Sequence, residues 1–404
     1  MAGMPMRRRA RWVPVDRWID GRLRTADKMA AWTKGKTGPI GIDLGAYRVR
    51  VVQASHDDGD LTVVAAGEAP AVQGSERYED RFRANASALR SLIRDRGFRG
   101  RDVVVSVPLE AVRIKNVRLP SMPERELAEA VRYEALERFQ TLGVDPEIRH
   151  FVTGHVAGGE NDQLEVVVLG VPRDVIDGLL GGIGDAGFVC AGLDVAPLAT
   201  FRPFERFLNR AEDRERTSAF LDIGHDGSRV VIARGGEIAF VKVLDVGVAQ
   251  LAAMTARALS VGDDEALTMV CATLSHGESR GADGGAPEAV AVLSAIEGGI
   301  EQLAKDIGLC LRYLSVTFPG MRPDALTCVG GGAKLPLLIE RIEGQLGLRT
   351  RPGQPFRNIA VGDVLSGSDR RGDQSQWTVA LGLAMKTICV RCSTAAGPRE
   401  EVSA

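Results

Sequence analysis

The chain has 404 residues, 45% of them apolar, and a formal net charge of -2. This length and composition predict a globular protein of several subdomains and exclude a predominantly disordered chain. The near-neutral charge argues against binding nucleic acid over the whole surface, and we expect no nucleic-acid partner.

The six cysteines are scattered, and only Cys389 and Cys392 are spaced as a CxxC pair. Because no second pair or nearby histidine accompanies them, we interpret them as two free thiols near the tail. Such usage is typical of reduced, cytosolic thiols. No apolar run is long enough for a signal peptide or a membrane span of about 20 residues, so we expect a cytoplasmic protein.

Residues 1–38 form a basic extension with ten Arg or Lys residues, three Asp and three of the four tryptophans. From Val15 onward its apolar residues keep a helical period, with basic residues around them. This composition is typical of a helix at an anionic membrane surface, where each basic residue contributes about 1 kcal/mol. The alternative is a tail that docks on the body or on a partner, or stays unfolded. Co-sedimentation with acidic liposomes, with and without this segment, distinguishes the two interpretations.

A unit of three strands joined by tight turns and followed by a helix occurs twice in the chain. The first unit covers strands within residues 39–67 and a helix at 81–96. The second has strands at 219–221, 230–232 and 238–243 and a helix at 248–259. The repeat predicts two similar lobes, lobe I over 39–100 and 191–212 and lobe II over 213–262 and 299–389.

Between the two units, residues 101–190 predict a compact α+β insert in lobe I. Its first helix is expected to begin with Ser121 as N-cap and Glu124 in the capping-box position. Leu127, Val131, Ala135 and Phe139 lie four apart and form its buried stripe. Beyond the second unit, residues 263–298 predict a reduced small subdomain of lobe II, a long helix follows from 296 to 316, and residues 390–404 form a tail.

Three glycine-containing loops each follow a predicted strand. Tight glycine turns can direct several backbone N–H groups at phosphate oxygens, and three successive glycines allow a flat ring to approach the backbone. The candidate binding residues are Asp43, Gly45, Ala46, Tyr47 and Arg50 in the first loop, Asp222, Gly224 and Ser228 in the second, and Gly330, Gly331 and Gly332 in the third. We expect the loops of the two lobes to face each other across a cleft of nucleotide size.

The two carboxylates of these loops would repel phosphates unless a cation lay between them. Mg²⁺ keeps several of its waters and is suited to one or two carboxylates plus phosphate oxygens. We therefore interpret Asp43 and Asp222 as holding Mg²⁺ through water.

The ordered loops resemble the phosphate-1, phosphate-2 and adenosine motifs of the actin-like ATPase superfamily. The start of the insert helix, Leu119-Pro120-Ser121-Met122-Pro123-Glu124, resembles the type IV pilus assembly protein PilM family. Leu193-Asp194-Val195-Ala196-Pro197 and Ala380-Leu381-Gly382-Leu383-Ala384 share that likeness, which covers residues 38–388.

This resemblance implies an α/β, two-lobed actin-like fold of duplicated RNase H-like lobes, with the α+β subdomain inserted in the first lobe as in FtsA. It implies ATP and Mg²⁺ in the cleft, and a groove between the insert and lobe I for the cytoplasmic N-terminal tail of an inner-membrane PilN-like protein. The family resemblance further implies a cytosolic scaffold, peripherally associated with the inner membrane, that couples the membrane complex to the pilus motor ATPase.

The first loop departs from the family pattern of small hydroxyl residues followed by Lys, because Ala46, Tyr47 and Arg50 occupy those positions. Arg50 keeps the charge as a larger planar group, and Tyr47 is expected to narrow the phosphate end. The segment Leu193 to Leu208 lacks the Gln that orients water in actin, so at most a weak ATPase is expected. His225 is either a solvated turn residue or a catalytic base.

Two alternatives stay open. One is a nucleotide-free structural adaptor like the GspL proteins of type II secretion, which the altered first loop would suit. The other is a small-molecule kinase of the same superfamily, for which no base carboxylate can be assigned from the sequence.

Overall fold

The computed structural model describes residues 37–387, apart from 58–59, 73–77, 140–141, 157–161, 209–210, 276–286, 363 and 365–373. Residues 1–36 of the basic extension, the glycine-rich segment at 276–286, the Cys389/Cys392 pair and the tail lie outside the described residues. The predictions made for those segments therefore stay predictions.

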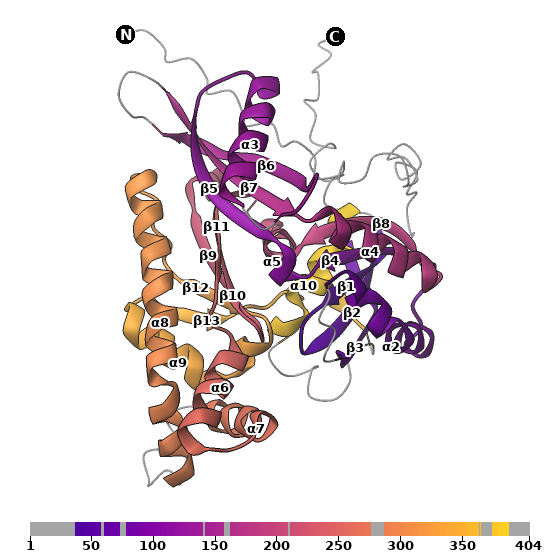
Figure 1. Ribbon diagram of the computed structural model, residues 1–404, viewed down its shortest axis with the longest axis vertical. Helices are drawn as coiled ribbons and strands as arrows, with labels where there is room; N and C mark the ends of the chain where they lie inside the picture. The colour runs from indigo at the N-terminus through magenta and orange to yellow at the C-terminus, as the bar shows by residue number, and fades with distance from the viewer. Residues whose placement is uncertain are drawn as a thin grey trace, which may run out of the picture.

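Two sheets repeat one topology, as the duplicated sequence unit predicts (Figure 1). Each begins with an antiparallel meander and continues with parallel strands beside the first strand. Lobe I has the order β14-β3-β2-β1-β4-β8, and lobe II has the order β11-β10-β9-β12-β13. The lobe I strands are β1 (Thr37–Leu44), β2 (Arg48–Asp57), β3 (Asp60–Pro70), β4 (Asp102–Val107), β8 (Val189–Val195) and β14 (Ala360–Val361); those of lobe II are β9 (Thr217–Ile223), β10 (Ser228–Arg234), β11 (Glu237–Leu244), β12 (Leu326–Val329) and β13 (Thr350–Pro352).

Helices cover both faces of the lobe I sheet. The central strands therefore carry apolar side chains on both faces. Val103 and Val105 of β4 pack toward α2 (Arg81–Asp95) and α4 (Arg173–Asp185), whereas Val104 packs toward α5 (Ala196–Glu205) and α10 (Thr378–Ala384). All three valines are fully buried.

The lobe II sheet is covered on one face by helices and on the other by α5 and the insert. Leu221 and Ile223 of β9 pack among the helices of the lobe, whereas Phe220 packs against Phe201 and Phe204 of α5. The helices of this lobe are α6 (Val248–Leu259), α7 (Asp263–Leu274), α8 (Pro287–Thr317) and α9 (Pro336–Leu346). Alternate β9 residues thus join two different cores.

The insert is smaller than the predicted 101–190. Its three-stranded sheet, ordered β5-β7-β6, consists of β5 (Arg113–Pro120), β6 (Glu147–Val156) and β7 (Gln163–Val171), with α3 (Glu124–Arg138) on its outer face. β4 and β8 pair in parallel with lobe I strands instead, and α4 packs with α2. The hydrophobic pattern of the sequence predicts β4 and β8 as strands and α4 as a helix. It does not predict which sheet each of them joins or covers, because that depends on strand pairing and packing.

The buried stripe of α3 is as predicted, but its start differs. Leu127, Val131 and Ala135 are buried. Pro123 occupies the N-cap position, and no side chain caps the helix. The Ser121 N–H donates to the Asp162 carbonyl at 2.8 Å. Ser121 is therefore part of the approach to α3 and is not its N-cap.

The end of the region assigned to lobe II, 299–389, returns to lobe I. β14 pairs with β3, and α10 packs on the lobe I sheet against α5. A Cβ at Gly382 of α10 would lie 1.9 Å from the Ala199 carbonyl oxygen of α5. Only glycine permits this separation of the two backbones.

A buried carboxylate holds the same junction. Asp194, fully buried at the end of β8, pairs with Arg202 at 2.8 Å and with Lys386 at 3.4 Å. Arg202 also donates to the Gly382 carbonyl at 2.6 Å. Burial alone would raise the pKa of Asp194, but Lys386 and Arg202 hold it below its ordinary value. Asp194 is therefore charged at neutral pH and ties α5 to the end of α10.

A second buried carboxylate attaches the insert to lobe II. Glu165 of β7 accepts hydrogen bonds from Arg118 of β5 and from the Tyr313 hydroxyl of α8. Arg118 also donates to Thr317 Oγ1 of α8 at 2.7 Å. These contacts, together with the hydrophobic core that the insert shares with both lobes, fix its position on α8.

We predict that Asp194→Asn lowers the free energy of unfolding by about 3–5 kcal/mol at neutral pH, because Arg202 and Lys386 lose their buried anion. Since the pKa is lowered, this stabilisation is present above about pH 4 and is lost as the pH falls through the folded value. Denaturant unfolding measures the change. Asp185→Asn, which removes an aspartate with a 66% exposed side chain paired with Arg83, is the matched control and should cost at most about 1 kcal/mol. Equal losses in the two variants would contradict the assignment.

Candidate functional site

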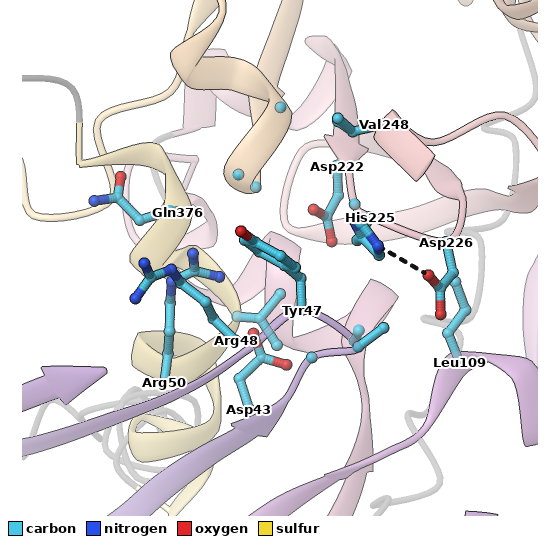
Figure 2. A pocket seen from close by; sticks show the side chains of 18 of the residues that line it. Asp43, Tyr47, Arg48, Arg50, Leu109, Asp222, His225, Asp226, Val248 and Gln376 are labelled. Carbon is cyan, nitrogen blue, oxygen red and sulfur yellow. Dashed lines mark ion pairs between the residues drawn. The ribbon is translucent and has the colours of Figure 1, made fainter. Parts of the chain in front are cut away.

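A cavity of about 330 Å³ lies between the two lobes, where the loops after β1, β9 and β12 meet (Figure 2). Each loop follows the carboxyl end of a central strand, so the duplicated topology brings equivalent ends of the two sheets together. In α/β sheets, ligands bind at such strand ends.

Ten of the eleven predicted binding residues line this cavity. They are Asp43, Gly45, Ala46, Tyr47, Arg50, Asp222, Gly224, Gly330, Gly331 and Gly332. Ser228 does not line it: the residue is fully buried, and its Oγ donates to the Val246 carbonyl at 2.7 Å. Ser228 therefore supports the turn before α6, and the second loop offers no hydroxyl from this position.

The third loop approaches Asp222 so closely that glycine is required. Gly330 has φ 83°, and a Cβ there would lie 2.3 Å from Asp222 Oδ1. The following residues, Gly331–Lys334, form a 3-10 turn before α9 begins at Pro336. The N-terminus of α9 is therefore separated from the glycines by one turn.

Each aspartate stands opposite an arginine across its hairpin. Asp43 is the register partner of Arg50, and Asp222 is the register partner of Arg229. Directly opposed side chains on one face of an antiparallel pair are close enough to interact. Arg229 forms an ion pair with Asp222, which is only 2% exposed and also accepts from Thr200 Oγ1 at 3.3 Å.

The environment of Asp43 disfavours its charge. Burial raises the pKa of Asp43 above its ordinary value and the nearby Asp222 adds to the rise, whereas Arg50 and Arg229 oppose it. Asp43 accepts from Ser106 Oγ at 3.3 Å. The two aspartates thus share one cluster of basic side chains.

The predicted role of both aspartates as holders of Mg²⁺ through water stays a prediction, and their present partners bear on it. The Oδ2 oxygen of Asp222 already has a guanidinium and a hydroxyl as partners, and burial raises the pKa of Asp43. Within the described part of the chain, no group of three or more His, Cys, Asp or Glu residues is placed to hold a metal ion. A hydrated Mg²⁺ needs carboxylate oxygens that are charged and available.

Tyr47 and His225 bridge the two lobes within the cavity (Figure 2). Their rings stack with centroids 5.0 Å apart and planes inclined by 23°. Burial lowers the pKa of His225, so its imidazole is neutral at pH 7. His225 is therefore a half-buried stacking partner, a role that neither sequence interpretation included.

A pair of carboxyl groups also spans the cleft. Glu110, in the 3-10 turn Leu109–Ala111 of lobe I, and Asp226 of the second loop share a hydrogen bond. Burial, the hydrogen bond and the charge of Glu110 raise the pKa of Asp226 to about 6, although Arg81 and Arg229 oppose the rise. Arg81 binds both oxygens of Glu110, at 3.1 and 3.2 Å.

Sequence reasoning missed several residues of this wall, including Ser106, Glu110, Arg229 and Gln376. One signal was available for Arg229, since Asp-x-Gly-x4-Arg occurs in both repeats. β4 lies beside β1 in lobe I as β12 lies beside β9 in lobe II, so the turn with Glu110 after β4 is the counterpart of the third loop after β12. Only the strand pairing reveals this equivalence. Gln376 precedes α10, whose return to lobe I was not expected.

Two sheets of one topology, meeting at three glycine loops, define the two-lobed actin-like fold. The sequence matches the family described as type IV pilus assembly protein PilM over residues 41–388. The chain belongs to this family of type IV pilus assembly proteins, which confirms the resemblance seen in the insert and loops.

Solved structures show similar folds. A PilM–PilN type IV pilus biogenesis complex shares 25% identity over 87% of this chain and 98% of that chain, with a TM-score of 0.70. The ethanolamine utilization protein EutJ from Carboxydothermus hydrogenoformans is 14% identical in sequence over 87% of this chain and 90% of that chain, with a TM-score of 0.49. MreB5 of Spiroplasma citri bound to AMPPNP is 11% identical in sequence over 90% of this chain and 100% of that chain, with a TM-score of 0.48. No curated protein sequence matches the chain. Across the described residues, no helix has the length and apolarity needed to cross a membrane.

We predict that Asp226→Asn raises thermal stability at pH 7.5 and has little effect near pH 4. With a pKa raised to about 6, the folded protein binds a proton more tightly than the unfolded chain between about pH 4 and 6. The free energy of unfolding of the natural protein therefore falls across that range, and Asn removes this contribution.

Melting curves at closely spaced pH values measure the difference between the two proteins. Asp245→Asn, at an exposed aspartate of lobe II, controls for the loss of one charge. A difference that does not change with pH would contradict the prediction.

Proposed function

We propose that the protein is an ATP-binding adaptor of a type IV pilus or a related secretion machine. The observation that carries the nucleotide assignment is the cavity between the lobes, whose wall contains ten of the eleven residues predicted to bind a nucleotide. Its glycine turns supply backbone N–H groups for phosphate oxygens, and Gly330 to Gly332 leave room for a flat ring.

The adaptor role is favoured over metabolism of a small molecule. Three of the five cavity carboxylates, Glu68, Glu110 and Asp222, have an arginine as a direct partner. A kinase of this superfamily needs a base carboxylate that faces its substrate. Any hydrolysis of ATP is proposed to be weak, because Leu193 to Leu208 contains no Gln to orient water.

We predict that saturating ATP, supplied with magnesium at 100 times its dissociation constant, stabilises the protein by about 2.7 kcal/mol. Gly330→Ala should abolish this stabilisation, because the added Cβ displaces Asp222. Gly347→Ala is the matched control, since Gly347 also has a positive φ but faces open space. Thermal shift measures both.

Three other results would change the assignment. The absence of any shift with ATP in the natural protein would favour a nucleotide-free adaptor of the GspL kind. Phosphate transfer that depends on an added sugar or carboxylate would favour a kinase. An equal loss of the ATP shift in the two glycine variants would attribute the effect of Gly330→Ala to backbone strain alone.

The proposed partner is the cytoplasmic N-terminal tail of an inner-membrane PilN-like protein, with the insert as its docking module. The similar solved structure is a PilM–PilN complex, and the family match over residues 41–388 includes the insert. The α3 helix presents Tyr133, 69% exposed, and Leu136 on its solvent side. Exposed aromatic and aliphatic side chains on one helix face are typical anchors for a peptide. A pilus motor ATPase is a further proposed partner.

We predict that Tyr133→Ala weakens binding of a synthetic PilN-like tail by about tenfold, the loss expected of an interface anchor. Calorimetric titration measures it. Val316→Ala, on α8 with 74% exposure, is the control and should leave binding unchanged. If both variants bind like the natural protein, the tail does not use this face of α3.

We further propose peripheral association with the inner membrane on its cytoplasmic side, through the PilN-like partner and the basic residues 1–38. The charge of that segment supports this proposal, with ten basic and three acidic residues.

A further inference from the structure

The two lobes carry the same aspartate–arginine pair at the same place in the repeat. Arg50 follows Asp43 by seven residues, and Arg229 follows Asp222 by seven residues. In both lobes the strand register sets the arginine directly opposite the aspartate. We propose that these two arginines replace Mg²⁺ in the cavity, so that the site binds the metal-free polyphosphate of a nucleotide. This inference rests on the proposed nucleotide binding and specifies the ionic form of the ligand.

In the lobe II pair, one oxygen of the aspartate already has two partners. Asp222 is buried, with Arg229 as its ion-pair partner and Thr200 as a second hydrogen-bond donor. Both partners bind the same oxygen, Asp222 Oδ2, so a metal-bound water could reach that oxygen only by displacing a desolvated guanidinium. Removing one partner of a buried ion pair leaves the other charge without compensation.

The same arginines retain donors for an anion. Arg229 Nε is buried at the cavity wall, and no described residue accepts its hydrogen. Arg50 donates from Nε to Glu68 at 3.0 Å, while its Nη2 lies 4.0 Å from the position of a Cβ on Gly331. The guanidinium of Arg50 therefore reaches the third glycine loop with its terminal nitrogens.

The charge of the cluster around Arg50 also favours an anion. Arg48 and Arg50 share a single carboxylate, Glu68, at 3.2 and 3.0 Å. Figure 2 shows their guanidinium groups beside each other at the side of the cavity near Gln376. An arginine fork matches phosphate oxygens with two parallel hydrogen bonds, so two such groups can supply the positive charge that Mg²⁺ otherwise brings.

The first test is a calorimetric titration of the full chain with ATP, once with excess EDTA and once with excess MgCl₂. In excess MgCl₂ nearly all ATP carries the ion, which would face the two arginines, so ATP should bind at least as tightly in EDTA as in MgCl₂. A loss of more than about tenfold in EDTA would overturn this inference and leave nucleotide binding intact. No binding in either buffer would overturn the inference together with the proposed function.

The second test exchanges the two cations. Arg229→Gln should weaken ATP binding in EDTA by about tenfold or more, the loss of a charged hydrogen-bond donor. Added MgCl₂ should restore it, because Asp222 is then free to hold the hydrated ion. Arg234→Gln, on the same strand but paired with the exposed Glu215, is the matched control and should behave as the natural protein.

Unaltered binding of Arg229→Gln in EDTA would overturn the inference. If this variant does not fold, the comparison of the natural protein in EDTA and MgCl₂ decides alone. Arg229→Lys, which keeps the charge but loses the fork, should give intermediate binding in EDTA.

Discussion

The approach of two backbones between α5 and α10 is the constraint on which the arrangement of the lobes depends. The Ala199 carbonyl lies where any side chain at Gly382 would be, and Asp194 with its two cationic partners holds both helices on the lobe I sheet. α5 also packs against β9 through Phe220. One helix therefore fixes the separation of the two sheets, and with it the distance between the loops at the cavity.

The cavity between these loops is electrically balanced before any ligand enters. Five acidic and five basic side chains line it, and most of the acids have an arginine as a direct partner. Glu110 and Asp226 instead interact across the cleft, where burial and the nearby Glu110 raise the pKa of Asp226 to about 6. Opening the cleft would separate these groups, so the separation of the lobes and the protonation of Asp226 are linked properties.

The sequence contained enough information for the duplicated lobes, the three loops and most of the cavity wall, because glycine turns and hydrophobic periods are local signals. It did not reveal that β4 and β8 belong to lobe I, or that α10 returns there, since strand and helix partners are tertiary choices. The direction of the Ser228 side chain was not predictable for a related reason: a hydroxyl beside a phosphate-type loop can turn toward a backbone carbonyl instead. Contacts such as Tyr47 with His225 exist only once the lobes meet.

The attachment of the insert to α8 has a mechanical consequence. Because Glu165 is buried between Arg118 and Tyr313, the insert cannot slide along α8 without leaving an anion in the protein interior. A rotation of lobe II about the α5 junction would therefore also strain the hydrophobic core that the insert shares with lobe I. The position of the insert, and with it the outer face of α3, is therefore coupled to the separation of the two lobes at the cleft.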